Sequence, residues 1–177
     1  MRGFLRRLPR LLGSVPLLLA APIAPAHSAS DAYLTLSVDG KDESTLHGQW
    51  DIALRDLDFV LTLDVDADGE LTWGEVKRHQ ASIEHYAYEQ LRFEDETGAS
   101  CAIQPTRQLI DAHADGAYAA LFFDVRCAHR SKTLAMRYTL FFPIDPSHRG
   151  IFVMHSVEGT SSAVLSPQNA NVVLALR

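Results

Sequence analysis

Cysteine, basic side chains and long apolar runs are all scarce in this sequence, and each shortage excludes a class of protein. Only two cysteines, Cys101 and Cys127, occur among 177 residues, too far apart for the Cys-x-x-Cys spacing of thiol redox enzymes. Lysine and arginine total 16 against 22 acidic residues, so the chain offers little positive surface to nucleic acid or an anionic membrane. Beyond residue 26, no apolar run reaches the roughly 18 residues that a membrane-spanning helix needs.

Motifs of common catalysts are missing as well. No Gly-rich phosphate-binding loop occurs, and residues 158–162 lack the glycines that flank a nucleophilic serine in hydrolases. Asp111, His113 and Asp115 alternate near an expected hairpin tip, either as a weak metal site or as a polar strand end, which we favour. An acid/base pair assembled across loops leaves no local motif, so an enzyme of unrecognised type stays open as an alternative.

The first 26 residues have the composition of a secretory signal peptide. Four arginines precede an apolar stretch at residues 11–24, and residues 24–26 are the small residues that signal peptidases read. The stretch is short and broken by proline, which suits a leader better than a membrane anchor. We therefore expect an exported protein, periplasmic or secreted, with residues 27–177 as one domain. Removal of the leader would change the formal net charge from −6 to −10, because it takes away four arginines and no acid.

The two cysteines are predicted to form a disulfide bond. An exported chain meets an oxidising compartment, where an even number of cysteines favours pairing. We expect the bond to join Cys101 and Cys127, with two buried thiols as the alternative. Closing a loop of this size would stabilise the fold by roughly 3 kcal/mol in the chain-entropy model.

The most specific motif is an acidic loop at residues 64–75. It follows the EF-hand calcium-loop pattern, with acidic residues at loop positions 1, 3, 5 and 12, glycine at 6 and a large aliphatic residue at 8. The aspartates would each give a carboxylate oxygen, position 7 its backbone carbonyl, position 9 a hydroxyl or a held water, and position 12 two oxygens. The predicted metal ligands are Asp64, Asp66, Asp68, Glu70, Thr72 and Glu75.

Calcium is the ion that this loop suits best. Gly69 stands where the loop must turn sharply, and Leu71 would anchor the loop to the core. Magnesium demands a smaller octahedral shell and retains its waters, so it fits a loop with many carboxylates poorly. The remaining alternative is a solvated turn, because aspartate side chains readily hydrogen-bond their own backbone. We expect a bound Ca²⁺ ion that is structural or weakly sensory.

Alternation of apolar and polar residues dominates the chain and predicts a mainly β fold. Residues 33–38 and 46–54 alternate and predict a hairpin. From residue 91 onward the alternation returns, with turn signals every 8–12 residues, which is typical of an antiparallel β-sandwich. The later predicted strands cover residues 91–94, 101–112, 117–127, 132–142, 151–157, 161–165 and 172–176.

Helical spacing interrupts the strands between about residues 55 and 91. A short helix is predicted before the acidic loop, and a helix of about four turns is predicted to begin near Trp73. The apolar stripes of the two helices are Leu54, Leu57 and Leu61, then Val76, Ile83, Ala87 and Leu91. The sequence therefore predicts a β-sandwich that carries an EF-hand helix–loop–helix insertion.

A single EF-hand lacks the second one with which such motifs usually pair. We expect its helices to pack on the sheets, with Trp50, Phe59 and Trp73 near the junction. A homodimer through paired loops is the competing arrangement, and the sequence leaves the oligomeric state open.

Six segments, in order along the chain, carry a likeness to a known family. They are residues 33–36, 49–58, 64–75, 115–118, 140–142 with 145–150, and 163–167. Their order resembles the exported N-terminal region of the HupE/UreJ-type hydrogenase/urease accessory membrane proteins. In that family membrane helices, thought to handle metal ions such as nickel, follow the exported region. The resemblance here covers only the exported part, so it implies a calcium-loop domain and no transport activity.

From these observations we predict a non-catalytic, exported calcium-binding protein. The resemblance adds an alternative, a soluble module that docks on a HupE/UreJ-type metal permease or accessory complex. Its partner would then be a membrane or periplasmic protein.

Overall fold

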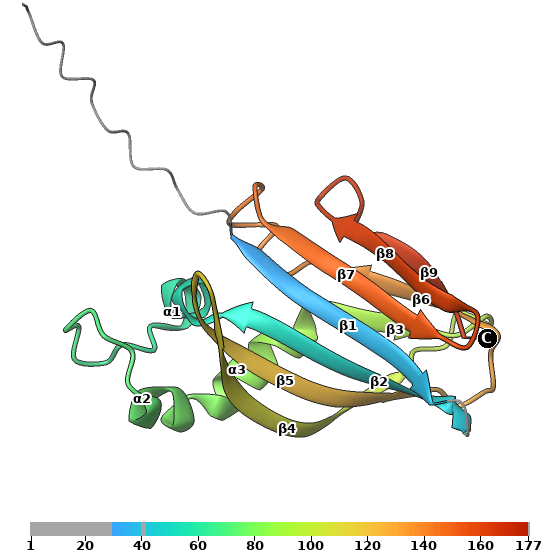
Figure 1. Cartoon of the computed structure of the whole chain (residues 1–177), viewed down its shortest axis with the longest axis horizontal. Coiled ribbons are helices and arrows are strands. Elements are labelled where there is room, and N and C mark those ends of the chain that lie inside the picture. Colours follow the sequence, from blue (N-terminus) through green and yellow to red (C-terminus); the bar gives the residue numbers. More distant parts are fainter. Residues whose placement is uncertain (1–29, 40–41, 177) are drawn as a thin grey trace, which may run out of the picture.

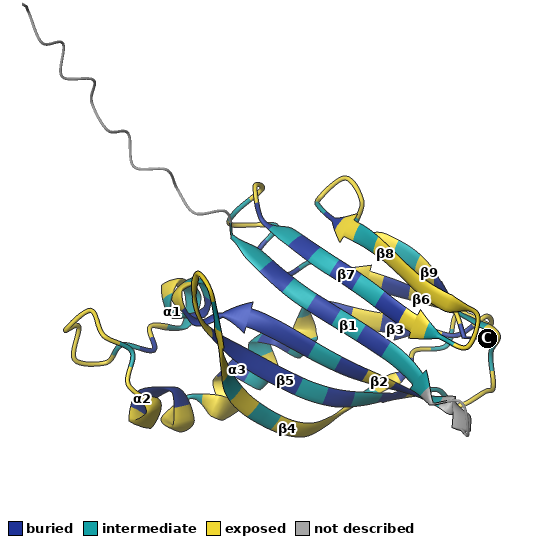
Figure 2. Ribbon diagram, in the orientation of Figure 1, coloured by how far each residue is buried: buried dark blue, intermediate teal, exposed yellow. Residues whose placement is uncertain are grey.

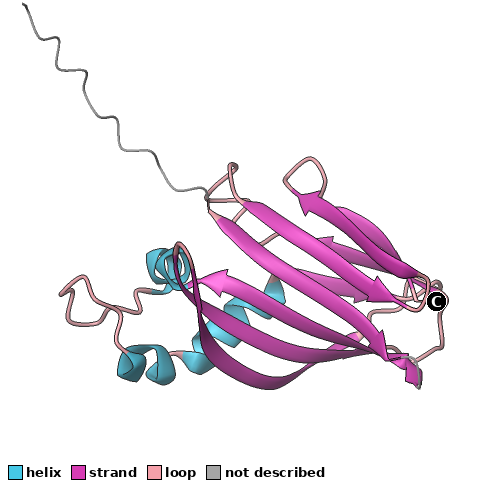
Figure 3. Ribbon diagram, in the orientation of Figure 1, coloured by secondary structure: helices cyan, strands magenta, loops and turns pink. Residues whose placement is uncertain are grey.

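The computed structural model describes residues 30–39 and 42–176, so the predicted signal peptide lies outside the described residues. The described part of the chain forms nine strands and three helices (Figures 1 and 3). The strands are β1 (Asp31–Asp39), β2 (Asp42–Ala53), β3 (Leu91–Glu94), β4 (Ala102–His113), β5 (Gly116–Arg126), β6 (Thr133–Tyr138), β7 (Arg149–Ser156), β8 (Gly159–Leu165) and β9 (Asn171–Ala175). The helices are α1 (Leu54–Leu61), α2 (Trp73–Arg78) and α3 (Gln80–Glu89).

The strands form two sheets, which confirms that the protein is mainly β. The larger sheet has the strand order β4-β5-β2-β1-β7-β8, and the smaller has the order β3-β6-β9. Both predicted hairpins, β1–β2 and β4–β5, are present with antiparallel register. The prediction of a wholly antiparallel arrangement is wrong at one place, because β1 and β7 pair in parallel. These two strands are far apart in the sequence, so no tight turn forces them to run in opposite directions.

One hydrophobic core lies between the two sheets. Alternate side chains of β1 are buried, including Leu34 and Leu36, and Figure 2 shows the resulting bands of buried and half-buried positions along this strand; Trp50 of β2 is buried as well. The indole of Trp50 on β2 lies 5.5 Å from the Tyr138 ring on β6, centroid to centroid, so the sheets are in direct contact. Phe93 on β3 is fully buried and belongs to the same cluster.

The helices pack on the core through the stripes that their spacing predicts. Leu57, Ile83 and Ala87 are fully buried, and the Tyr88 ring of α3 meets the Phe123 ring of β5 edge-on at 5.6 Å. The predicted four-turn helix is instead divided into α2 and α3 at His79, whose ψ of 7° leaves the helical range.

Two of the three aromatic residues expected at the junction of helices and sheets are largely exposed. Trp50 is buried, but the side chains of Phe59 and Trp73 are 81% and 59% exposed. Phe59 follows Leu57 by two residues, which places the two side chains on opposite faces of α1, and Leu57 takes the inner face.

The predicted strand at residues 132–142 is also shorter than expected. β6 ends at Tyr138, because Phe141 takes a left-handed φ of 57° and the backbone N–H of Phe142 donates to the Thr139 carbonyl in a turn.

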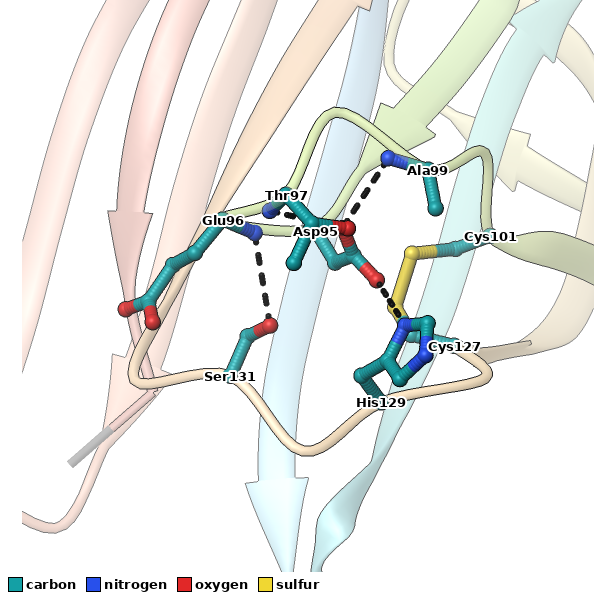
Figure 4. A network of polar contacts seen from close by, with 8 residues as sticks. All are labelled: Asp95, Glu96, Thr97, Ala99, Cys101, Cys127, His129 and Ser131. Carbon is teal, nitrogen blue, oxygen red and sulfur yellow. Dashed lines mark hydrogen bonds and ion pairs between the residues drawn. A yellow bond between two sulfur atoms is a disulfide. The ribbon is translucent and has the colours of Figure 1, made fainter.

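The predicted disulfide between Cys101 and Cys127 is confirmed. It joins the open ends of β4 and β5, where Ala102 and Arg126 form the last pair of the register. Beside it, the buried Asp95 carboxylate accepts hydrogen bonds from the Thr97 hydroxyl and backbone N–H and from the Ala99 N–H, and it contacts the His129 ring at 3.0 Å (Figure 4). These bonds, the Thr97 hydroxyl above all, lower the pKa of Asp95 to about 2.

The close packing of Gly48 under the Phe123 ring gives a stability test. A Cβ at residue 48 would collide with Cζ of Phe123, so Gly48→Ala must displace a buried ring. We expect Gly48→Ala to lower the free energy of unfolding by about 2–3 kcal/mol in urea denaturation. Gly74→Ala is the control, since its nearest neighbour would be 3.9 Å away and alanine suits a helix better than glycine. Equal stabilities of the two variants would contradict this packing.

Candidate metal centre

The acidic loop is held between the end of α1 and the start of α2, at one end of the molecule (Figure 1). Helix α1 stops at Thr62, which takes a left-handed φ of 51° while its N–H donates to the Asp58 carbonyl at 2.8 Å. The Asp58 carboxylate then accepts the Asp64 N–H at 2.9 Å, so the end of the helix fixes the first residue of the loop. Leu71 packs against the core, as the sequence predicts.

Three carboxylates converge inside the loop. One oxygen from each of Asp64, Asp66 and Asp68 lies within 4.8 Å of the other two. The loop closes on itself because the Gly69 N–H donates to Asp64 Oδ2 at 2.9 Å. Gly69 has a φ of 85°, which a residue with a Cβ rarely adopts, and this accounts for glycine at the turn.

Like charges crowd this cluster, and one oxygen in it has no partner. The charge of Asp68 and, to a smaller extent, burial raise the pKa of the Asp66 carboxyl. Asp64 Oδ1 is buried and accepts no hydrogen bond from the described residues. Buried polar atoms are nearly always partnered, so this oxygen is available as a ligand for a cation. Hard divalent cations prefer carboxylate oxygens, and the residues present therefore fit such an ion.

Glu75 and Thr72 make different contacts from those that the loop pattern predicts. Thr72 is the N-cap of α2, and Glu75 Oε2 accepts from the Thr72 N–H at 3.0 Å and from its hydroxyl at 2.7 Å. Glu75 Oε1 accepts the Val65 N–H at 3.1 Å. Hydrogen bonding, chiefly from Thr72, lowers the pKa of Glu75. The two residues thus form a capping box, and the structure does not bring the Glu75 carboxylate into the aspartate cluster.

Glu70 has an exposed side chain, and its backbone N–H donates to Asp68 Oδ1 at 2.8 Å. Its predicted contribution, the backbone carbonyl, needs no particular side chain at this position.

The polar residues at the tip of the β4–β5 hairpin form no metal set with one another. His113 Nε2 lies 3.7 Å from Asp51 Oδ2, and its ring stacks on Tyr118 with centroids 4.0 Å apart. Asp115 accepts the Tyr118 hydroxyl at 2.9 Å. These partners are typical of a polar strand end, which is the interpretation that the sequence favours. In the described residues, three or more histidine, cysteine or carboxylate side chains converge as a possible metal site at the aspartate cluster of the loop.

A buried hydrogen-bonded chain around His148 escaped the sequence analysis. The Ser30 hydroxyl donates to Asp56 Oδ2 at 2.9 Å, so it must accept from His148 Nδ1–H at 2.7 Å. His148 Nε2 is then left to accept the Tyr138 hydroxyl at 2.8 Å. Serine, histidine and aspartate are also the residue types of hydrolase active sites, but His148 is fully buried here. The row of hydrogen bonds instead connects the start of β1 to the loop before β7.

The structure thus defines a mainly β protein with an acidic loop between two helices, in which three aspartates could hold a cation. The chain matches no protein-family profile and no curated protein sequence. In the described residues, no helix is long and apolar enough to cross a membrane. The functional argument therefore rests on the loop.

The buried His148 predicts a specific pH dependence of stability. Burial lowers its pKa to about 4 from the usual 6.5. Between pH 6.5 and 4 the unfolded chain therefore takes up a proton that the folded chain refuses. Stability is full above pH 6.5 and falls by a total of about 3 kcal/mol by pH 4. Urea denaturation across this range should show the loss in the wild type and in His85→Gln, whose residue is exposed.

His148→Gln should flatten the pH dependence between pH 6.5 and 4. If that variant fails to fold, NMR titration of the wild-type histidines gives the same test. A His148 ring that takes up its proton above pH 6 would contradict the prediction.

Proposed function

We propose that this protein is an exported, non-catalytic calcium-binding protein, built as a β-sandwich that carries an EF-hand helix–loop–helix. Two observations carry the proposal. Carboxylate oxygens of Asp64, Asp66 and Asp68 converge, and one buried oxygen among these residues, Asp64 Oδ1, accepts no hydrogen bond from the described residues. The proposal is also supported by the position of the loop, which lies between α1, ending at Leu61, and α2, beginning at Trp73. The two sheets that enclose one core support the sandwich description.

The ligand set would extend beyond the three aspartates. Calcium takes six to eight oxygens, so the Glu70 carbonyl, the Thr72 position and Glu75 would complete the shell. Glu75 would have to share or release the hydrogen bonds from Thr72 and Val65. A bound cation neutralises the charge that now raises the pKa of Asp66, and it ties the start of α2 to the end of α1.

Calcium of this kind would be structural or weakly sensory. Extracellular modules bind calcium at roughly 10⁻⁴–10⁻³ M, which suits a compartment outside the cytoplasm. The proposed export to the periplasm or beyond rests on the signal-like residues 1–26 and on the Cys101–Cys127 disulfide, a bond that forms in oxidising compartments.

The second candidate role is a partner module for a HupE/UreJ-type permease or accessory complex. It is favoured by the exposed apolar side chains around the loop, since Phe59, Val65 and Trp73 are 81%, 62% and 59% exposed. Large apolar side chains that are exposed and not packed in the core are available for contacts with another protein. Calcium could then control how rigidly these side chains are presented.

Loop variants test calcium binding directly. Saturating Ca²⁺ at about 100 times Kd should stabilise the wild type by about 2.7 kcal/mol, seen as a rise of several degrees in Tm. Asp64→Ala and Glu75→Gln should each abolish this rise, because each removes a predicted ligand. Isothermal calorimetry on chelator-stripped protein should show that Ca²⁺ binds in preference to Mg²⁺ and Ni²⁺.

Glu70→Gln is the matched control within the loop, because only the backbone carbonyl of that residue is expected to bind. It should keep the calcium-dependent rise in Tm. A rise that survives in both Asp64→Ala and Glu75→Gln would eliminate the loop as the calcium site.

Analytical ultracentrifugation separates packing of the helices on their own sheets from pairing of loops between two chains. The buried Leu57, Ile83 and Ala87 already occupy the inner faces of the helices, so we expect the same sedimenting mass with and without calcium. A doubling of mass on adding calcium would support the homodimer through paired loops instead.

A further inference from the structure

Two arginines stand directly opposite each other on the smaller sheet. The register pairs Arg92 of β3 with Arg137 of β6, and Asn171 of β9 continues the same cross-strand row. Their neighbours Phe93 and Met136 are buried, so the alternation of the strands places both arginines on the outer face of this sheet. Neither charged group packs in the core.

Neither guanidinium is paired with a carboxylate of the described residues. Within residues 30–39 and 42–176, no acidic side chain forms an ion pair or hydrogen bond with Arg92 or Arg137. The other charged groups nearby are Glu94, two residues along β3, and Glu89, which instead contacts His85 at 3.3 Å. Like charges directly opposite each other in a sheet are destabilising, and no carboxylate of the described residues forms an ion pair with either guanidinium to offset that cost.

The arginines line a hollow that can admit a ligand. It has a volume of about 560 Å³ and spans all three strands, with Arg92, Arg137, Asn171 and Thr139 among its polar lining residues. Glu89 and Glu94 also border it, and Val173, which is 73% exposed, adds apolar surface. The hollow is therefore amphipathic, with two adjacent cationic groups and two carboxylates beside them.

We propose that this hollow binds a ligand through an oxyanion, a carboxylate or a phosphate, held between Arg92 and Arg137. The planar guanidinium presents a fork of donors that matches both oxyanions. An oxyanion placed between two opposed arginines relieves their repulsion as well as forming hydrogen bonds. Glu89 and Glu94 oppose high negative charge, so they favour singly charged groups over highly charged ones. The site is distant in sequence from the acidic loop and does not depend on calcium.

Titration with inorganic phosphate and with succinate tests the proposal and separates the two sources of oxyanion. The experiment uses the disulfide-bonded chain at low salt, in buffer passed over a chelating resin, because a dissolved chelator is itself a polycarboxylate. Backbone amide shifts should move in β3, β6 and β9 with at least one of the two anions. Arg92→Gln and Arg137→Gln should each weaken the affinity about tenfold, since each removes a charge-assisted contact.

Arg126→Gln is the matched control, because Arg126 lies on β5 and contacts Asp124 at 3.8 Å. Phosphate raises the Tm of many proteins by exclusion from their surfaces, and Arg126→Gln should keep that general rise together with wild-type affinity. In the absence of anion, Arg92→Gln should be at least as stable as the wild type. Amide shifts that are missing with both anions, or affinities that fall equally in all three variants, would overturn the proposal.

Discussion

Mutual repulsion among carboxylates is the constraint around which this molecule is built. Oxygens of Asp64, Asp66 and Asp68 are held within 4.8 Å of one another, and the charge of Asp68 already raises the pKa of Asp66. Such an arrangement persists only where the surrounding chain enforces it or a cation balances it. Here the enforcement comes from backbone donors, since the N–H groups of Gly69 and Glu70 are both directed at aspartate oxygens.

The rest of the fold supplies a rigid support for this strained loop. Leu57 on one side and Val76 on the other are buried in the core that the two sheets enclose. The capping box of Thr72 and Glu75 fixes the first turn of α2. The packed core and the capping box thus hold the loop from both sides.

Local patterns were sufficient to predict much of this structure. Leu34 and Leu36 alternate with half-buried residues, Leu91 and Phe93 alternate with exposed ones, and the strands form where that alternation occurs. The helical stripes and the disulfide were also predictable. The acidic loop could be located because its characteristic residues all lie within one short stretch of sequence, where their spacing can be compared with the calcium-loop pattern.

Features that depend on distant residues were not predictable. The parallel pairing of β1 with β7 is one, and the burial of His148, which requires Ser30 and Tyr138 as partners, is another. Glu75 shows a different difficulty. A threonine followed three residues later by glutamate is at once positions 9 and 12 of a calcium loop and a capping box, so the same letters encode two roles.

The parallel pairing of β1 with β7 also has a consequence for how the chain folds. During synthesis or translocation from the N-terminus, β1 can form its hairpin with β2 early, but its other edge must wait for a strand that follows most of the remaining sequence. Until then the free edge of β1 exposes a row of backbone hydrogen-bond donors and acceptors, and such edges are where aggregation with another chain commonly begins. Completion of the large sheet is therefore a late, long-range event, and a holding chaperone would be most useful in that interval.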